Sequence, residues 1–227
     1  MIHLLWPTIR PHTMVKTLDL WMNRASNTSQ IKTYIAVNNN DQKQQILNLL
    51  EQKHSLSKNE INVYVSGEIV GVTNASDYLT HLEELDGPDN DIIILSSDDM
   101  IAPNNWDKWI ISNIKPPYEA IVVNDGYIRQ DNITLPIMNM KCLKTLNRII
   151  YHKSYKHSYS DTELYDTLKS MKILKDLWTS SPIFEHRNWA NNKREADIVD
   201  RQIRNYVTSD AENWNKRKKL SLRDRLV

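Results

Sequence analysis

Short apolar runs alternate with amphipathic helical segments through the first half of the sequence, and this alternation constrains the fold more than any other feature. The runs lie at residues 2–6, 33–37, 62–66, 91–95 and 120–123. Between the first four, apolar residues recur at helical spacing, as at Val15, Leu18 and Met22. Strands separated by helices of about ten or more residues need crossover connections and therefore pair in parallel. We expect an α/β fold, a three-layer α/β/α sandwich with a mostly parallel central sheet.

The second half contains fewer strand-like runs. Residues 135–151 predict a short strand that enters a helix, and residues 181–189 predict a late strand that ends in polar residues. A long helix is expected from about Arg194 to Trp214. The inner face of that helix would be formed by Ala196, Val199, Ile203 and Val207.

Composition limits the class of protein. A chain of 227 residues with 40% hydrophobic residues can bury one good core, so one domain is the default. The net charge of +1 gives no overall field of the kind that marks a dedicated nucleic-acid binder. The single cysteine, Cys142, excludes an intramolecular disulfide and a zinc site of several cysteines. Without a recognisable signal peptide or an apolar run of membrane-spanning length, we expect a cytoplasmic protein.

Basic residues concentrate near the end of the sequence, in residues 215–225. Such a cluster is first interpreted as a solvated tail. The second interpretation is a patch that binds a phosphate-rich partner or a membrane surface.

The run at residues 92–95 ends abruptly in Ser96, Ser97, Asp98 and Asp99. Ligands collect at the carboxyl ends of parallel strands, so these acids would lie where chemistry usually takes place. The alternative is that they only shape a turn before Pro103. The sequence has no GxGxxG fingerprint, P-loop or GxSxG elbow. A phosphate-bearing ligand would therefore need a divalent metal held by carboxylates, for which Asp98 and Asp99 are candidates.

Several short motifs resemble, in their order along the chain, those of the family-two glycosyltransferases, which use nucleotide sugars and have the GT-A fold. The order is more specific than any one motif, and it spans almost the whole chain. A basic tail on a small protein also resembles glycosyltransferases carried by phages. The motifs are PTIRPH at 7–12, VNNND at 37–41, the segment at 71–95, SSDDM at 96–100, YSDTEL at 159–164 and FEHRNW at 184–189.

The resemblance implies a division of the chain. A single GT-A-like catalytic domain would cover residues 1–214. It would consist of a nucleotide-binding half at 1–103, an acceptor-binding half at 104–192 and a closing helix at 193–214, followed by a basic tail at 215–227.

The resemblance also implies a metal site and a donor site. Asp99 and His186 would bind Mn²⁺ or Mg²⁺, and an oxygen-rich site with one imidazole suits Mn²⁺ slightly better. Ser97 stands where the family often has a third acid, which favours Asp99 over Asp98 as the ligand. Without the resemblance, His186 would be interpreted as a half-buried histidine at a strand end. The nucleotide-sugar donor would contact Pro7, Thr8, Arg10, Asn38, Asp41, Asn74 and Asp98.

Some of these residues also have structural interpretations. Asp41 and Asn74 are candidate N-caps of helices, and Arg10 could cap a helix at the surface. Asp161, which the resemblance makes the catalytic base, would be stabilised in the first turn of a helix whatever its role. Glu163, a second catalytic candidate, has capping-box spacing from Ser160.

The expected function is metal-dependent transfer of a sugar from a nucleotide diphosphate, with UDP as the expected nucleotide, to an acceptor hydroxyl with inversion. The acceptor would be a glycan, a lipid-linked sugar, a small molecule or a hydroxymethylated DNA base. The rival is a non-catalytic module that binds nucleotides or nucleic acid on the same fold, because fold does not fix function.

Overall fold

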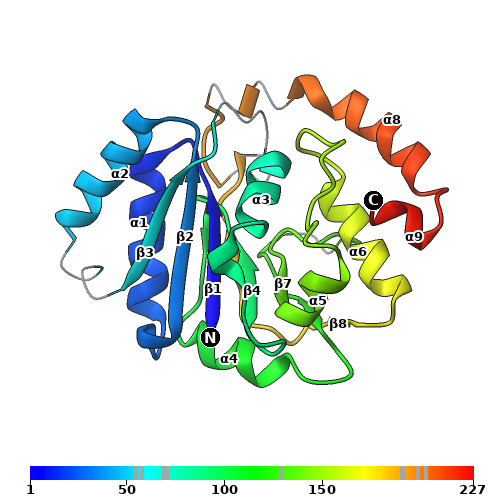
Figure 1. The fold of residues 1–227 in the computed structure, drawn as a ribbon, viewed down its shortest axis with the longest axis horizontal. Helices are drawn as coiled ribbons and strands as arrows, with labels where there is room; N and C mark the ends of the chain where they lie inside the picture. Colours follow the sequence, from blue (N-terminus) through cyan, green and yellow to red (C-terminus); the bar gives the residue numbers. More distant parts are fainter. Residues whose placement is uncertain are drawn as a thin grey trace.

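The computed structural model describes residues 1–53, 56, 59–67, 72–127, 130–189, 193–197, 200–201 and 204–227. A central sheet lies between two layers of helices (Figure 1). Its strand order is β3-β2-β1-β4-β7-β6-β8, and β5 and β9 form a separate two-stranded ribbon. The strands are β1 (Ile2–Pro7), β2 (Ile31–Val37), β3 (Glu60–Val65), β4 (Ile92–Leu95), β5 (Met100–Ile101), β6 (Ala120–Val122), β7 (Ile137–Asn139), β8 (Leu174–Asp176) and β9 (Glu185–His186).

Within the seven-stranded sheet, only β7 runs against its neighbours. Strands β3, β2, β1 and β4 pair in parallel, as do β6 and β8, whereas β7 is antiparallel to both β4 and β6. The predicted mostly parallel sheet is confirmed. Its consequence is that β1, β2, β4 and β6 all deliver their carboxyl ends to the same edge of the sheet.

Two hydrophobic clusters lie on the two faces of the sheet. One cluster contains buried residues of α1, α2 and α4, and the other contains buried residues of α3, α5 and α6. Helices α8 and α9 lie at the end of the molecule beyond α6 (Figure 1). The helices are α1 (Pro11–Arg24), α2 (Asn40–Glu51), α3 (Val72–Thr80), α4 (Trp106–Asn113), α5 (Met140–Thr145), α6 (Ser160–Ser170), α8 (Val207–Arg217) and α9 (Leu222–Arg225).

Three fully buried tryptophans support the segment that follows β4. The rings of Trp6 and Trp106 make edge contacts with Trp21, at centroid distances of 5.7 and 4.9 Å. The indole N–H of Trp21 donates to the carbonyl of Met100 at 2.7 Å, and that of Trp106 donates to the carbonyl of Trp21 at 2.8 Å. This packing fixes the backbone directly after Asp98 and Asp99.

Two predicted helix N-caps are wrong. Asn39, not Asp41, caps α2, because its extended backbone lets its side chain accept from the N–H of Gln42 at 2.9 Å. Asn74 lies inside α3, which begins at Val72.

The capping box predicted at the start of α6 does not form. Tyr159, with a φ of 64°, precedes the helix and makes no capping bond through its side chain. The hydroxyl of Ser160 instead donates to the carbonyl of His157 at 3.2 Å, and Glu163 turns to a partner on α8.

The long helix predicted from Arg194 to Trp214 is found only in part, as α8. Residues 193–197 are not helical. There the carboxylate of Asp200 accepts from the N–H of Asp197 at 2.9 Å, and that of Asp197 accepts from the N–H of Asp200 at 3.0 Å. Such side-chain bonds compete with the helical ladder. Val199 and Ile203, predicted for its inner face, lie outside the described residues.

The basic segment first interpreted as a solvated tail is partly helical, and most of its side chains are exposed. Helix α8 continues to Arg217, which is buried, and α9 follows after a turn. No helix in the described part of the chain has the length and hydrophobicity needed to cross a membrane.

Candidate active site

Asp98 follows the carboxyl end of β4 and is held there by residues of α1 and of the segment that connects β1 to α1. Its carboxylate accepts from the hydroxyl of Thr8 at 3.1 Å and from the guanidinium of Arg10 at 3.2 Å. Its carbonyl accepts from the hydroxyl of Thr17 at 2.8 Å. Burial raises the pKa of Asp98, against the opposing effect of the Arg10 charge. The predicted donor residues Thr8, Arg10 and Asp98 are thus brought together.

Asp99 and His186 converge from β4 and the ribbon. Their side chains approach to 3.6 Å between Oδ2 and Nε2. The backbones are tied as well, since Met100 pairs with His186 and the carbonyl of Asp99 accepts from the N–H of Arg187 at 2.7 Å. Ser97, at the position where the family often has an acid, donates its hydroxyl to Asp99 at 2.7 Å. Ser97 therefore orients the carboxylate beside it.

The electrostatics keep Asp99 ionised. Burial alone would raise its pKa, but hydrogen bonding and charge from His186, the hydroxyl of Ser97 and the charge of Arg194 together lower the pKa to about 2. For His186, burial would lower the pKa, but the carboxylates of Asp99, Asp125 and Asp161 raise it. The pair is an ionised carboxylate facing an imidazole whose protonated form the surrounding acids favour.

This pair fits a divalent metal that is also coordinated by a ligand. Metal bonds to carboxylate oxygen and imidazole nitrogen are roughly 2.0–2.2 Å long, so one ion can contact two atoms 3.6 Å apart. A set of one carboxylate and one imidazole suits Mn²⁺ or Mg²⁺ when oxygens of a phosphate ligand and water complete the shell. Among the described residues, no group of three or more histidine, cysteine or acidic side chains gathers in a way that could hold a metal alone.

Asp161 lies in the first turn of α6 and its charge acts on His186. Its carboxylate accepts from the amide of Asn132 at 3.1 Å and from the N–H of Thr162 at 2.9 Å. Burial raises its pKa, and these hydrogen bonds and the charge of His186 oppose the increase. A carboxylate with a raised pKa is a better proton acceptor, which suits the predicted role of base.

One arginine and two acids that the sequence motifs did not single out, Arg194, Asp197 and Asp200, complete the charge distribution around Arg10. Arg10 forms a two-pronged contact with Asp197, at 2.7 and 3.0 Å, and reaches Asp200 at 3.2 Å. Arg194 is paired with Asp200 and lies 3.7 Å from the same oxygen of Asp99 that faces His186. The helix predicted from Arg194 to Trp214 gave no reason to assign residues of this segment to the site. The signal in the sequence was the density of opposite charges in residues 193–200.

The other predicted donor contacts are more widely distributed. Pro7 ends β1, and Asn38 follows β2, the neighbouring strand. Asp41 is exposed in the first turn of α2. Asn74 belongs to α3, which covers the opposite face of the sheet from α2. Pro7 and Asn38 therefore lie beside the strand-end cluster, while the other two are carried by helices on different faces.

Glu163, the second catalytic candidate, is buried in an ion pair between α6 and α8. It is 5% exposed and accepts from Arg217 at 2.9 to 3.1 Å. It also accepts from the hydroxyl of Tyr155 at 2.5 Å. These contacts join α6 to α8 and leave its carboxylate fully engaged.

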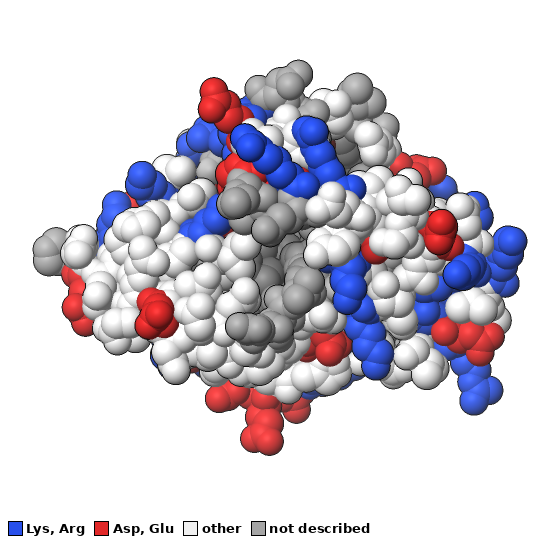
Figure 2. Space-filling view, turned by 90° about the horizontal axis from the view of Figure 1, so that it is seen from above, with Lys and Arg blue, Asp and Glu red and all other residues white. Residues whose placement is uncertain are grey.

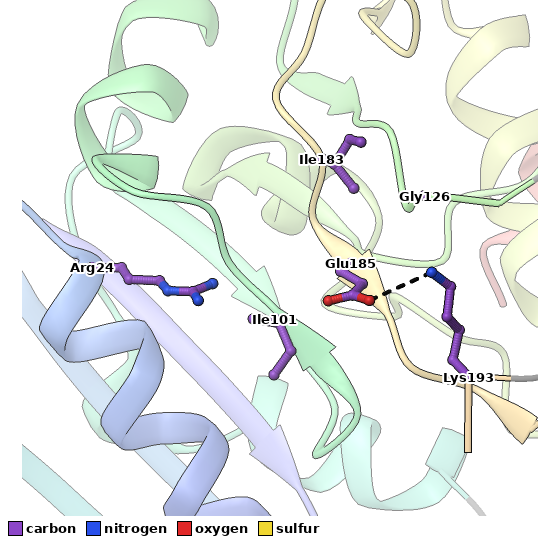
Figure 3. Close-up of a pocket in the computed structure, with 6 residues that line it drawn as sticks. All are labelled: Arg24, Ile101, Gly126, Ile183, Glu185 and Lys193. Carbon is purple, nitrogen blue, oxygen red and sulfur yellow. Dashed lines mark ion pairs between the residues drawn. The ribbon is translucent and has the colours of Figure 1, made fainter. Parts of the chain in front are cut away.

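A pocket of about 320 Å³ lies along the ribbon (Figure 3). Glu185 lines it and pairs with Lys193 at 3.6 Å. Because side chains alternate along a strand, Glu185 and His186 point to opposite faces of β9. The pocket therefore opens on the face of β9 opposite to the pair of Asp99 and His186. Its lining residues are Arg24, Ile101, Gly126, Ile183, Glu185 and Lys193.

No known family and no curated protein matches this sequence. Solved structures do match. Residues 1–349 of S. aureus TarS align with a TM-score of 0.62 and 12% identity, covering 99% of this chain and 76% of that one. The mannosyltransferase PcManGT of Pyrobaculum calidifontis aligns with a TM-score of 0.58 and 10% identity, covering 80% of this chain and 54% of that one. The chain has a GT-A-type fold.

A third GT-A neighbour is glucosyl-3-phosphoglycerate synthase of Mycobacterium tuberculosis, with a TM-score of 0.54 and 12% identity over 93% of this chain and 79% of that one. PcManGT is described with GDP-Man and Mn²⁺, TarS with UDP or UDP-GlcNAc, and the synthase with Mg²⁺ and UDP. This chain spans about half the length of PcManGT (54%), 76% of the TarS chain of residues 1–349 and 79% of the synthase. The neighbours are glycosyltransferases, and they give no support to a phage source.

Proposed function

We propose that the protein is a metal-dependent glycosyltransferase that moves a sugar from a nucleotide diphosphate, with UDP as the expected nucleotide, to an acceptor hydroxyl with inversion. One observation carries the proposal. On a GT-A-type sheet, Asp99 and His186 converge to 3.6 Å, and Asp161 lies close enough to raise the pKa of that histidine. The nucleotide sugars and ions bound by the fold neighbours support the same type of ligand.

The residues have separate roles in this proposal. Asp99 and His186 would hold Mn²⁺ or Mg²⁺, which when bound would stabilise the negative charge that grows on the leaving diphosphate. Arg10 beside Asp98 and Arg194 beside Asp99 supply two guanidinium groups that would bind diphosphate oxygens. Thr8 and Asp98 would contact the nucleoside. Asp161 would take the proton of the acceptor hydroxyl.

The first experiment measures release of the free nucleoside diphosphate from a panel of UDP- and GDP-sugars with Mn²⁺. The expected result is slow hydrolysis of one donor, which a chelator and Asp99→Asn both remove. The matched control is Asp89→Asn, which neutralises an exposed acid just before β4, at the opposite end of the strand from Asp99. This control should hydrolyse the donor at the wild-type rate.

Calorimetry on the same samples separates the alternatives. Metal-dependent binding of a donor without hydrolysis, even with acceptors of each class present, would favour the non-catalytic nucleotide-binding module. Absence of any nucleotide binding would overturn the proposal.

The acceptor classes are a glycan, a lipid-linked sugar, a small molecule and a hydroxymethylated DNA base. The DNA acceptor makes a distinct prediction, because the affinity of a protein that binds phosphates falls steeply with salt concentration. A flat salt dependence of DNA binding, or no binding, would remove that acceptor.

A further inference from the structure

Four exposed cations gather around the turn between α8 and α9. They are Lys216, Lys218, Lys219 and Arg223. The acid in this stretch, Asp224, accepts a hydrogen bond from the hydroxyl of Ser221 at 2.6 Å. Figure 2 shows basic side chains projecting at the end of the molecule where Figure 1 places α8 and α9. This end is therefore locally basic, although the whole chain has a net charge of only +1.

Two leucines are exposed within the same turn. Leu220 is 41% exposed and Leu222 is 36% exposed. Single exposed leucines are ordinary on protein surfaces. Here, however, the two leucines are flanked on both sides by the exposed cations, which gives the turn an apolar centre and a basic rim. We call these six residues the α8–α9 surface.

The remaining two arginines of this stretch hold the turn in place. Arg217, which is buried against Glu163, donates to the carbonyl of Arg225 at 2.8 Å. Arg225 donates to the carbonyl of Lys218 at 2.7 Å and pairs with Asp166 on α6. The backbone on both sides of Leu220 is thus anchored to the body of the protein. The two leucines are presented to solvent by a fixed turn.

We propose that the α8–α9 surface docks the protein on a membrane whose surface carries anionic lipids. The cations match the phosphate groups of the lipids, and each lysine or arginine near such a surface strengthens binding by on the order of fivefold. The two leucines favour a membrane over a nucleic acid as the partner. Burying them in the boundary between headgroups and acyl chains strengthens binding, whereas a nucleic-acid backbone offers them no apolar partner.

Docking in this way also orients the proposed acceptor half of the protein. Near the other end of α8, the carboxylate of Asp210 accepts from the N–H groups of His157 and Ser158 at 2.9 and 2.8 Å. Helix α8 therefore connects the α8–α9 surface directly to the segment that precedes Asp161. The docking proposal itself does not depend on the chemistry proposed for the site.

The test is flotation of the full chain with lipid vesicles at low salt. Vesicles of phosphatidylcholine alone are compared with vesicles that also contain phosphatidylserine. Binding to the anionic vesicles is expected, with little binding to neutral ones. Replacing the four exposed cations of the surface by Gln should lower the affinity by at least about a hundredfold. Changing both leucines to Ser should lower it about tenfold, without any change in charge.

The matched control replaces four other lysines by Gln, so that the loss of charge is the same. They are Lys16, Lys43, Lys108 and Lys115, which lie on or beside helices of the opposite side of the protein. This variant should bind the vesicles like the wild type. Equal losses in both charge variants would overturn the proposal, because binding would then follow overall charge. No binding to anionic vesicles would also overturn it. So would binding to duplex DNA that equals vesicle binding and is unchanged by the leucine substitutions, since the surface would then be a general site for polyanions.

Discussion

A single buried carboxylate, Asp107, organises the turn that leads out of α1. It is 2% exposed and accepts three hydrogen bonds, from the N–H and hydroxyl of Ser26 at 2.8 and 2.6 Å and from the N–H of Asn27 at 2.9 Å. Burial alone would raise its pKa, but these donors favour the charged form and lower the pKa below 3.8. Its charge is therefore part of the stability of the fold.

Asp107→Asn should lower the free energy of unfolding by about 1–3 kcal/mol at pH 7, because buried donors lose an ionised partner. Since the folded pKa lies below the unfolded value of 3.8, the contribution is complete above pH 3.8 and is lost as the pH falls through the folded pKa. Urea unfolding of both proteins between pH 7 and pH 3 measures this difference. A difference that stays constant below pH 3.8 would show that the charge of Asp107 has no role.

Asp161→Asn tests the proposed base at the same scale. The variant should keep its affinity for metal and donor, whereas transfer to the acceptor should fall by about 10²–10⁴-fold. Because burial raises the pKa of Asp161 above 3.8, the wild-type rate should fall on the acid side at a pH above 3.8. Steady-state kinetics across pH give both results. An unchanged kcat in the variant would assign the proton to another group.

At the scale of elements, the contact between α6 and α8 depends on one buried ion pair. Glu163 and Arg217 are 5% and 8% exposed, and Tyr155 completes the hydrogen bonding of the glutamate. Removing one partner of such a pair is costly because the other charge stays buried.

Arg217→Met should therefore lower the free energy of unfolding by about 3–5 kcal/mol, and the double variant with Glu163→Leu should recover part of that loss. A double-mutant cycle in urea measures the coupling. Additive single losses would mean that the two side chains stabilise their helices independently. The control is Lys169→Met, at an exposed lysine on α6.

Several strands were predictable whatever their length. Runs such as Ile92–Leu95 bury both faces, and this pattern is visible in the sequence. The short strands β6, β7 and β9 also lie within segments predicted to contain strands, whereas β5 and β8 are too short to show a period and were missed. Residues 193–197 had helical spacing, but the side chains of Asp197 and Asp200 bind backbone N–H groups instead.

The candidate site was predictable to the same extent. Asp98 and Asp99 could be found because a buried strand ends in front of them. The position of Asp200 depends on a contact with Arg10, and that of Arg194 depends on a contact with Asp99. These partners are about a hundred or more residues away along the chain, so a local sequence pattern cannot predict the contacts. The capping box predicted at Glu163 was wrong because its spacing in the sequence is the same whether or not a distant arginine pairs with the side chain.

At the scale of the whole molecule, both hydrophobic clusters are built on one sheet. Alternate residues of β1 belong to different clusters, with Leu4 in one and Leu5 in the other. If either cluster unfolds, it disrupts strands that also contribute side chains to the other cluster. We therefore expect one cooperative unfolding transition, reported equally by tryptophan fluorescence and by far-UV circular dichroism.

Binding of the proposed ligands should raise the midpoint temperature of this single transition, to the same extent by both spectroscopic probes. A ligand that binds only the folded state stabilises it by about 2.7 kcal/mol at a concentration of one hundred times its Kd. Because Asp99 and His186 offer two protein ligands for a metal that a diphosphate would complete, Mn²⁺ and UDP together should stabilise more than the sum of each alone. Thermal unfolding with each ligand, with both and with chelator measures the effect, and Asp99→Asn should abolish it while Asp89→Asn should not. Stabilisation by UDP that is independent of metal and of Asp99 would place the nucleotide elsewhere on the protein. A shift seen by only one of the two spectroscopic probes would show that the two faces of the sheet unfold separately.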